Sequence, residues 1–125
     1  MAVNTQVNLG GLIMRNPVTV ASGTFAAGRE YADFVDLSRL GAVTTKGVSL
    51  NGWAGNDAVR IAETPSGMLN SIGLQNPGVD HLIEGDIAWL ATQDAPCIVN
   101  VSGHSVGEYQ AVVERLEDCP HVHAY

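Results

Sequence analysis

The sequence predicts an α/β fold in which parallel strands alternate with helices. Short runs rich in β-branched residues occur at residues 17–21, 42–48 and 96–101, and each contains or precedes a glycine. Between and after these runs, apolar residues repeat at steps of three and four, the spacing of a helix with one buried face. Strands and helices in repeated alternation favour parallel pairing through crossover connections.

The first unit begins with the strand at residues 17–21, PVTVA, which is apolar enough to be buried and precedes a Ser-Gly turn. Apolar residues at helical spacing predict a helix over residues 29–40. Gly41 stands where the C-cap of that helix is expected. The strand at residues 42–48 follows directly.

Two further helices have start signals. Asn76 is predicted as an N-cap with Pro77 at the first helical position, and an apolar stripe at helical spacing follows. Ser105 and Glu108 have the spacing of a capping box ahead of a second stripe. Residues 121–125 are predicted as the start of a fourth strand.

The composition indicates one globular domain within 125 residues. A net charge of −7 supplies no basic face, which argues against nucleic-acid and anionic-membrane partners. The first residues resemble neither a signal peptide nor a membrane span, so a cytoplasmic location is expected. Cys97 and Cys119 are expected as reduced thiols, since no redox motif surrounds them.

Residues 50–76 have no sustained helical or alternating pattern and are dense in Gly, Asn, Ser and Thr. Loops this long in compact domains are usually functional or disordered. Sparse charge and several apolar side chains favour an ordered binding loop. Asn70, Gln75 and Asn76 supply amide donors and acceptors that suit a planar heterocycle, although a turn-rich structural loop explains the composition equally well.

Ligands of parallel α/β proteins collect at the carboxyl ends of the strands. Ala21, Ser22 and Gly23 follow the first strand, where small residues allow a flat ring to approach the backbone. Lys46 and Gly47 end the second strand, and Asn100 lies inside the third. The alternatives are an ordinary turn, a surface lysine and an asparagine bonded to a neighbouring strand.

The remaining candidate motifs carry no assignable chemistry. Cys119, His121 and His123 fall short of a zinc-site pattern, so no metal is expected. The carboxylates show no pairing typical of acid–base catalysis, and dinucleotide and triphosphate fingerprints are absent from the sequence.

Four segments, NPVTVASGTF, GAVTTKGVS, RIAETPSGMLNSIGLQNPG and PCIVNVSG, together resemble the dihydroorotate dehydrogenases. The third segment is the most specific and is similar to the class 1B branch, whose members pass electrons to NAD through a partner subunit carrying FAD and an iron-sulfur cluster. The resemblance implies a (β/α)₈ TIM barrel. Residues 1–125 are then one partial barrel domain, truncated on the C-terminal side, with three βα units and the start of a fourth strand.

The resemblance also implies roles for individual residues. FMN is expected against Ala21, Ser22, Gly23, Lys46, Gly47 and Asn100. The substrate, dihydroorotate or its product orotate, is expected against Lys46, Asn70, Ser71, Ile72, Gly73 and Leu74. Lys46 would balance negative charge on the orotate carboxylate or on reduced flavin.

The sequence departs from the family pattern in two places. The cysteine general base of the family is expected beyond Tyr125, so no catalytic residue is assigned and the isolated chain is expected to be inactive. Residues 50–59 lack the basic and proline-containing character common in relatives. A homodimer joined to the electron-transfer subunit is implied for the full-length parent. The alternatives are a related flavin oxidoreductase, such as a dihydropyrimidine dehydrogenase, and a non-catalytic truncated remnant.

Overall fold

The centre of the computed structural model, which describes residues 3–125, is a parallel sheet in the spatial order β10-β9-β4-β3. Its strands are β3 (Thr19–Val20), β4 (Ala42–Thr44), β9 (Cys97–Ile98) and β10 (Val122–Ala124). Each strand lies beside the next parallel strand along the chain. This arrangement confirms the predicted parallel α/β fold, with strands shorter than the sequence pattern indicated.

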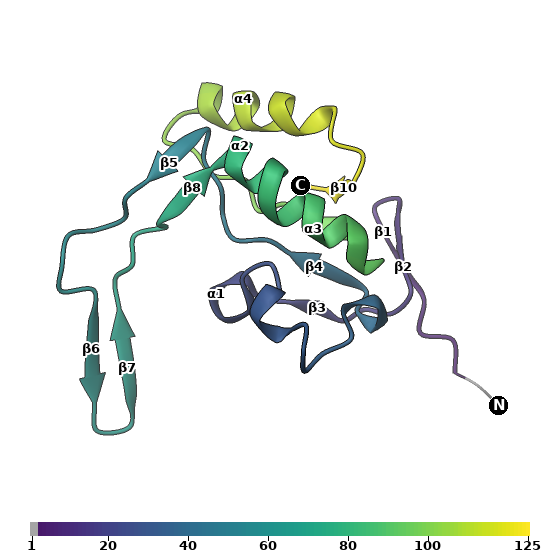
Figure 1. Ribbon diagram of the computed structural model, residues 1–125, viewed down its shortest axis with the longest axis horizontal. Helices are drawn as coiled ribbons and strands as arrows, with labels where there is room; N and C mark the ends of the chain where they lie inside the picture. Colours follow the sequence, from purple (N-terminus) through teal and green to yellow (C-terminus); the bar gives the residue numbers. More distant parts are fainter. Residues whose placement is uncertain (1–2) are drawn as a thin grey trace.

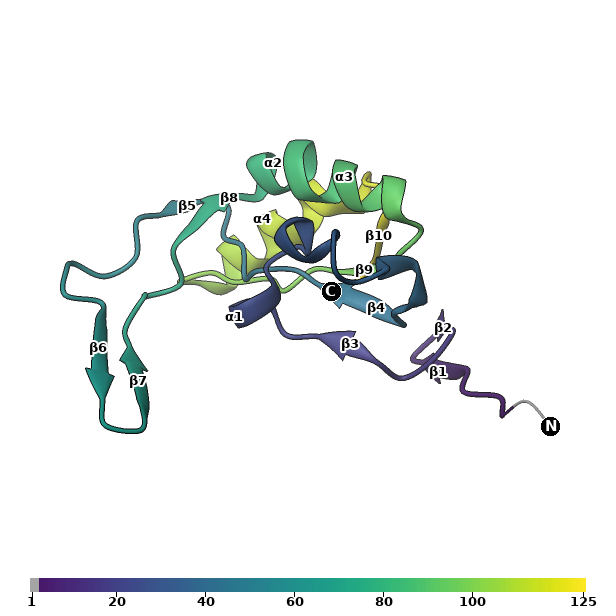
Figure 2. The same cartoon turned by 60° about the horizontal axis from the view of Figure 1, so that its bottom comes forward.

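Helices cover one face of this sheet (Figure 2). One continuous helical segment consists of α2 (Val79–Leu82), a π-helical turn (Ile83–Ile87), α3 (Ala88–Leu90) and a 3₁₀ turn (Ala91–Gln93). The helix α4 (Val106–Glu117) packs beside α2. No helix within residues 3–125 is long and apolar enough to cross a membrane.

The core lies between the sheet and these helices. Its fully buried side chains include Val43, Val99, Ile87, Leu90 and Leu116. Burial of each such side chain contributes about 1.5–3 kcal/mol of transfer free energy. The core therefore packs against one face of the sheet and leaves the carboxyl ends of the strands available for a site.

The predicted capping box of α4 is confirmed. The Ser105 hydroxyl accepts a hydrogen bond from the Glu108 backbone N–H at 3.3 Å. The Glu108 carboxylate in turn accepts from the His104 N–H. The first bond satisfies a backbone donor that the first turn of a helix leaves unpaired, and the second holds the N–H of the residue before the N-cap, one position earlier than in a standard capping box.

The predicted helix at residues 29–40 is wrong. Two 3₁₀ turns, Arg29–Tyr31 and Leu37–Arg39, occupy this stretch. Asp36 is extended, with ψ at 101°, and its carboxylate accepts hydrogen bonds from the backbone N–H and hydroxyl of Ser38. An aspartate side chain that accepts hydrogen bonds from the residues that follow it competes with continuation of the helix. The apolar stripe also has no common buried face, since Phe34 is 85% exposed while Leu37 is buried.

Gly41 is not a helix C-cap, because Leu40 before it is extended. The Gly41 N–H donates to the Val18 carbonyl at 2.8 Å. A Cβ on Gly41 would collide with the carbonyl oxygens of Asn16 and Val18. Glycine is needed here because two backbone segments approach closely at the start of β4.

The predicted helix start at Asn76 and Pro77 is also wrong. Asn76–Gly78 form a strand, β8, and the helix begins at Val79. The Asn76 side-chain oxygen accepts from the backbone N–H groups of Ser49 and Gly78, and from the Ser49 hydroxyl. A buried asparagine thus holds the end of the long loop against the segment after β4.

The long loop is an ordered two-stranded ribbon. Its inner part pairs β5 (Asn51–Trp53) with β8, and its outer part pairs β6 (Ile61–Thr64) with β7 (Gly67–Asn70), all antiparallel. Figure 1 shows the β6–β7 hairpin projecting away from the sheet. The loop is ordered, as predicted, but it contains strands that the sequence pattern did not indicate, because several paired residues, among them Asn51, Ala62 and Gly67, have weak β propensity.

Sequence analysis also missed a hairpin near the amino terminus. The strands β1 (Val7–Leu9) and β2 (Leu12–Met14) pair antiparallel across Gly10 and Gly11. Both glycines have positive φ, at 59° and 108°. A Gly-Gly pair between apolar residues is a recognised hairpin signal, so the sequence did contain the information.

Candidate functional site

The ends of β4 and β9 run side by side beyond the regular strands. The Thr45 N–H donates to the Ile98 carbonyl and the Val48 N–H donates to the Asn100 carbonyl, both at 2.9 Å. Val48 and Val101 form a further parallel bridge. This pairing places the Lys46–Gly47 segment beside Asn100 at the carboxyl edge of the sheet.

Gly47 lies close to both Asn100 and the long loop. A Cβ on buried Gly47 would lie 2.8 Å from Leu74 Cδ1 and 3.5 Å from Asn100 Nδ2. The structure therefore brings together three residues that the resemblance assigned to cofactor or substrate. The Asn100 residue is exposed, so its amide lies at an accessible edge of the cluster.

Thr45 belongs to this cluster and was missed by sequence analysis. It is fully buried, and its hydroxyl donates to the Lys46 carbonyl at 3.2 Å. The same oxygen lies 3.4 Å from the Asn100 backbone nitrogen, from which it accepts a hydrogen bond. A polar residue within a buried strand was the available signal, since such a side chain needs a partner.

Lys46 supplies the positive charge at this edge and is the only lysine in the sequence. The ion pairs found within residues 3–125 join Arg15 to Asp94, Arg29 to Asp86 and Arg115 to Asp80, and none of them includes Lys46. Lys46 is half-buried. A half-buried lysine that has no carboxylate partner among the described residues is suited to binding an anionic ligand.

The predicted residues after the first strand lie at the same edge. Val20 of β3 stands opposite Val43 of β4 in the parallel register. Ala21 then N-caps a short helix, α1 (Ser22–Phe25). Ser22 and Gly23 line a shallow hollow with Phe25 and Tyr31, whose rings stack with centroids 4.7 Å apart.

The predicted substrate residues are divided between two places. Asn70 ends β7 and pairs with Ile61, so it belongs to the projecting hairpin. Ser71 and Ile72 are held by the loop itself, because the Ser71 N–H donates to Arg60 and the Ile72 carbonyl accepts from Asn56. Gly73 and Leu74 then turn back, both with positive φ, toward Gly47. The structure thus brings Leu74 to the cluster at the strand ends, while Asn70 lies at the base of the projecting hairpin.

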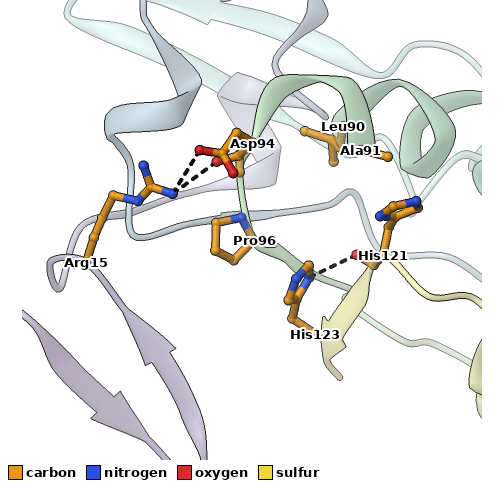
Figure 3. Close-up of a pocket in the computed structure, with 8 residues that line it drawn as sticks. Arg15, Leu90, Ala91, Asp94, Pro96, His121 and His123 are labelled. Carbon is orange, nitrogen blue, oxygen red and sulfur yellow. Dashed lines mark hydrogen bonds and ion pairs between the residues drawn. The ribbon is translucent and has the colours of Figure 1, made fainter.

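A separate cavity of about 160 Å³ lies beneath the amino end of β9. Figure 3 shows Arg15 facing Asp94 on one side and His121 and His123 on the other. Small-molecule sites usually occupy about 300–1,000 Å³. Within residues 3–125 no group of three or more metal-ligating side chains is found. Its size and its place near the amino end of a strand set this cavity apart from the carboxyl-edge cluster.

The two cysteines are unpaired thiols in the structure. Burial raises the pKa of Cys97 to about 12, with Cys119 and Asp86 adding to the shift. A thiol with so high a pKa is a poor nucleophile at neutral pH. Cys97 therefore acts as a core residue.

Comparison with known proteins identifies relatives of this chain. Two curated relatives are named "Dihydroorotate dehydrogenase B (NAD(+)), catalytic subunit". The one from Lachnoclostridium phytofermentans is 60% identical over 93% of this chain and 39% of its own length. The one from Alkaliphilus metalliredigens is 53% identical over 93% of this chain and 38% of its own length. The chain thus spans about two fifths of the relatives it matches.

A solved structure has a similar fold. It is titled "Crystal structure of DHODH in complex with ferulenol from Eimeria tenella" and matches 90% of this chain and 32% of its own, with a TM-score of 0.61. The sequence identity is 17%, so this likeness supports the fold alone.

Sequential parallel strands with helices over one face, together with the likeness to the solved structure, place the chain in the α/β class as part of a (β/α)₈ barrel. The sequence profile described as "Dihydroorotate dehydrogenase" matches residues 4–125. The chain belongs to the dihydroorotate dehydrogenase family.

Proposed function

We propose that this chain forms the amino-terminal part of the flavin and substrate pocket of an NAD-linked, class 1B dihydroorotate dehydrogenase. The supporting observation is the convergence of Lys46, Gly47, Leu74 and Asn100 at one edge of the sheet. On this proposal residues 1–125 are one partial barrel domain. The enzyme oxidises dihydroorotate to orotate in pyrimidine synthesis.

The residues at this edge fit FMN, the cofactor implied by the family. Gly47 allows the backbone to pack closely against Leu74, where a Cβ would stand only 2.8 Å from Cδ1, and Asn100 offers an amide beside it. The small residues Ala21, Ser22 and Gly23 lie at the end of the neighbouring strand. When bound, FMN would accept a hydride from the substrate.

The residues of this chain would bind and orient. Lys46 would pair with the substrate carboxylate and stabilise negative charge near the flavin. The segment Asn70–Leu74 would hold the pyrimidine ring through its amide and backbone groups, with Leu74 packed against Gly47. The cysteine that removes the ring proton is proposed to lie outside this chain.

The proposal includes partners. Electrons would leave through a subunit carrying FAD and an iron-sulfur cluster, with NAD as final acceptor, and the catalytic subunits would form a homodimer. A cytoplasmic location fits this biosynthetic role. Neither nucleic acid nor membrane belongs among the proposed partners.

The test is anaerobic reduction of the flavin-loaded enzyme that contains this chain. Dihydroorotate should bleach the flavin absorption and yield one orotate per flavin. Dihydrouracil, which lacks the carboxylate expected to pair with Lys46, should reduce the flavin far more slowly. Rapid bleaching by dihydrouracil and none by dihydroorotate would favour a dihydropyrimidine dehydrogenase and contradict the proposal.

A further inference from the structure

An aromatic contact lies beside the proposed pocket, and its residues are not among those proposed to bind flavin or substrate. The rings of Trp53, in β5, and His104, before α4, have centroids 4.0 Å apart at an interplanar angle of 32°. The contact stands where β5 meets the start of α4 (Figure 1). The two rings border a hollow whose other lining residues are Gly52, Ala54, Gly55, Asn56 and Gly73.

The backbone on each side of the contact is firmly held. Trp53 is paired with Asn76 across the β5–β8 ribbon. The His104 N–H is bound by the Glu108 carboxylate. Gly103 lies so close to α4 that a Cβ on it would stand 2.9 Å from Glu108 Cβ. The ring pair therefore joins two ordered elements rather than two mobile side chains.

The residues after Trp53 hold the proposed substrate segment. Arg60 donates to the Ala54 carbonyl at 2.9 Å and to the Gln75 side-chain oxygen at 2.7 Å. The Asn56 N–H donates to the Ile72 carbonyl at 3.0 Å, and the Asn56 amide donates to the Ser71 hydroxyl at 2.8 Å. A displacement of Trp53 would thus be passed directly to residues 71–75.

The residues before His104 lead to the other side of the pocket. Asn100 is followed by Val101, which bridges Val48, and by Ser102, whose N–H donates to the Val48 carbonyl at 2.8 Å. The segment between Asn100 and His104 is therefore pinned to the end of β4. The Trp53–His104 contact therefore links the segment proposed to bind substrate to the strand ends proposed to bind flavin.

We propose that Trp53 and His104 are a positioning pair that fixes the distance between the substrate segment and the strand ends bearing Lys46 and Asn100. This inference rests on the proposed function for its purpose, while the positioning itself is a property of the free chain. Aromatic pairs of this kind are worth enough to change a local equilibrium about two- to tenfold.

The primary test is amide hydrogen exchange of the full chain without ligand. The reporters are the Asn56 and Ser71 N–H groups, which are bonded to Ile72 and Arg60 within the loop. In His104→Ala both should exchange about two- to tenfold faster. In His104→Phe, which keeps a stacked ring, protection should return to the starting value. The Val43 N–H, bonded to Pro96 within the sheet, is the internal control.

The second readout is steady-state kinetics of the flavin-loaded enzyme. His104→Ala should raise KM for dihydroorotate about two- to tenfold with little change in kcat, and His104→Phe should restore KM. Unchanged exchange at Asn56 and Ser71 in His104→Ala would overturn the positioning role whatever the kinetics show. If the chain shows the predicted exchange pattern but the flavin-loaded enzyme that contains it does not turn over dihydroorotate, the positioning pair is retained and the proposed function is refuted.

Discussion

The close backbone approach at Gly41 gives the sharpest stability prediction. In Gly41→Ala the new Cβ would collide with the Asn16 carbonyl and stand 2.9 Å from the Val18 carbonyl, distances that Cβ atoms do not adopt in folded proteins. Neither oxygen belongs to a side chain that can rotate away. The backbone must separate, and the 2.8 Å hydrogen bond from Gly41 to Val18 is lost with it.

The magnitude follows from these two terms. Overpacking in a rigid site destabilises by about 1–3 kcal/mol, and the lost hydrogen bond adds about 0.5–1.5 kcal/mol. We therefore expect Gly41→Ala to lower the free energy of unfolding by about 2–4 kcal/mol. With an m-value of about 2 kcal/mol/M, the urea midpoint should fall by about 1–2 M.

The assay is urea unfolding followed by far-UV circular dichroism. The matched control is Gly107→Ala in α4, where the nearest atom to a new Cβ is 4.0 Å away. That variant should gain about 0.5–1 kcal/mol, because alanine is the better helix former. Equal midpoints for Gly41→Ala and the starting chain would refute the claim that backbone contact dictates glycine at this position.

Three further predictions concern the core and the helix end. His123→Phe removes the imidazole Nδ1 that accepts the Cys97 N–H at 3.1 Å, and should lower the free energy of unfolding by about 1–3 kcal/mol in thermal denaturation, whereas His121→Ala should change it by less than about 0.5 kcal/mol. Ser105→Ala removes the N-cap of α4 and should lower the free energy of unfolding by about 1 kcal/mol in urea unfolding. An unchanged midpoint would show that the hydrogen bond from the Glu108 N–H to the hydroxyl contributes no stability. Burial raises the pKa of Cys97 from 9.0 to about 12. The contribution of the protonated thiol to the free energy of unfolding is therefore complete below pH 9 and is lost as pH rises from 9 to 12. Unfolding midpoints that stay constant across this range would contradict the burial of the thiol.

The parallel pairing was predictable because β3, β4 and β9 lie within short runs rich in β-branched residues that alternate with helical spacing. The capping box at Ser105 and Glu108 was predictable for a similar reason, since the bonds that fix it are local. The helix at residues 29–40 was not, because a single capping aspartate, Asp36, overrides the apolar spacing. The spacing of apolar residues alone does not reveal that a side chain competes with the helix in this way.

The candidate site was predictable only in part. Lys46 and Asn100 follow from the rule that polar residues at strand ends face ligands. Leu74 reaches Gly47 through a turn of the long loop in which Gly73 and Leu74 have positive φ, which no short-range pattern in the sequence specifies. The contact between Trp53 and His104 joins residues 51 positions apart, and only Trp53 lies in the segment that departs from the family pattern. It depends on tertiary packing.

The central claim is that Lys46 faces the anionic substrate beside the flavin. The most direct test is stopped-flow reduction of the enzyme-bound flavin by dihydroorotate in Lys46→Met. The control is Arg115→Met, which removes a charge from an exposed ion pair between α4 and α2. Loss of a charged hydrogen bond worth about 1.5–3 kcal/mol predicts reduction roughly 10- to 100-fold slower in Lys46→Met and unchanged in Arg115→Met. Equal reduction rates in the two variants would contradict the account.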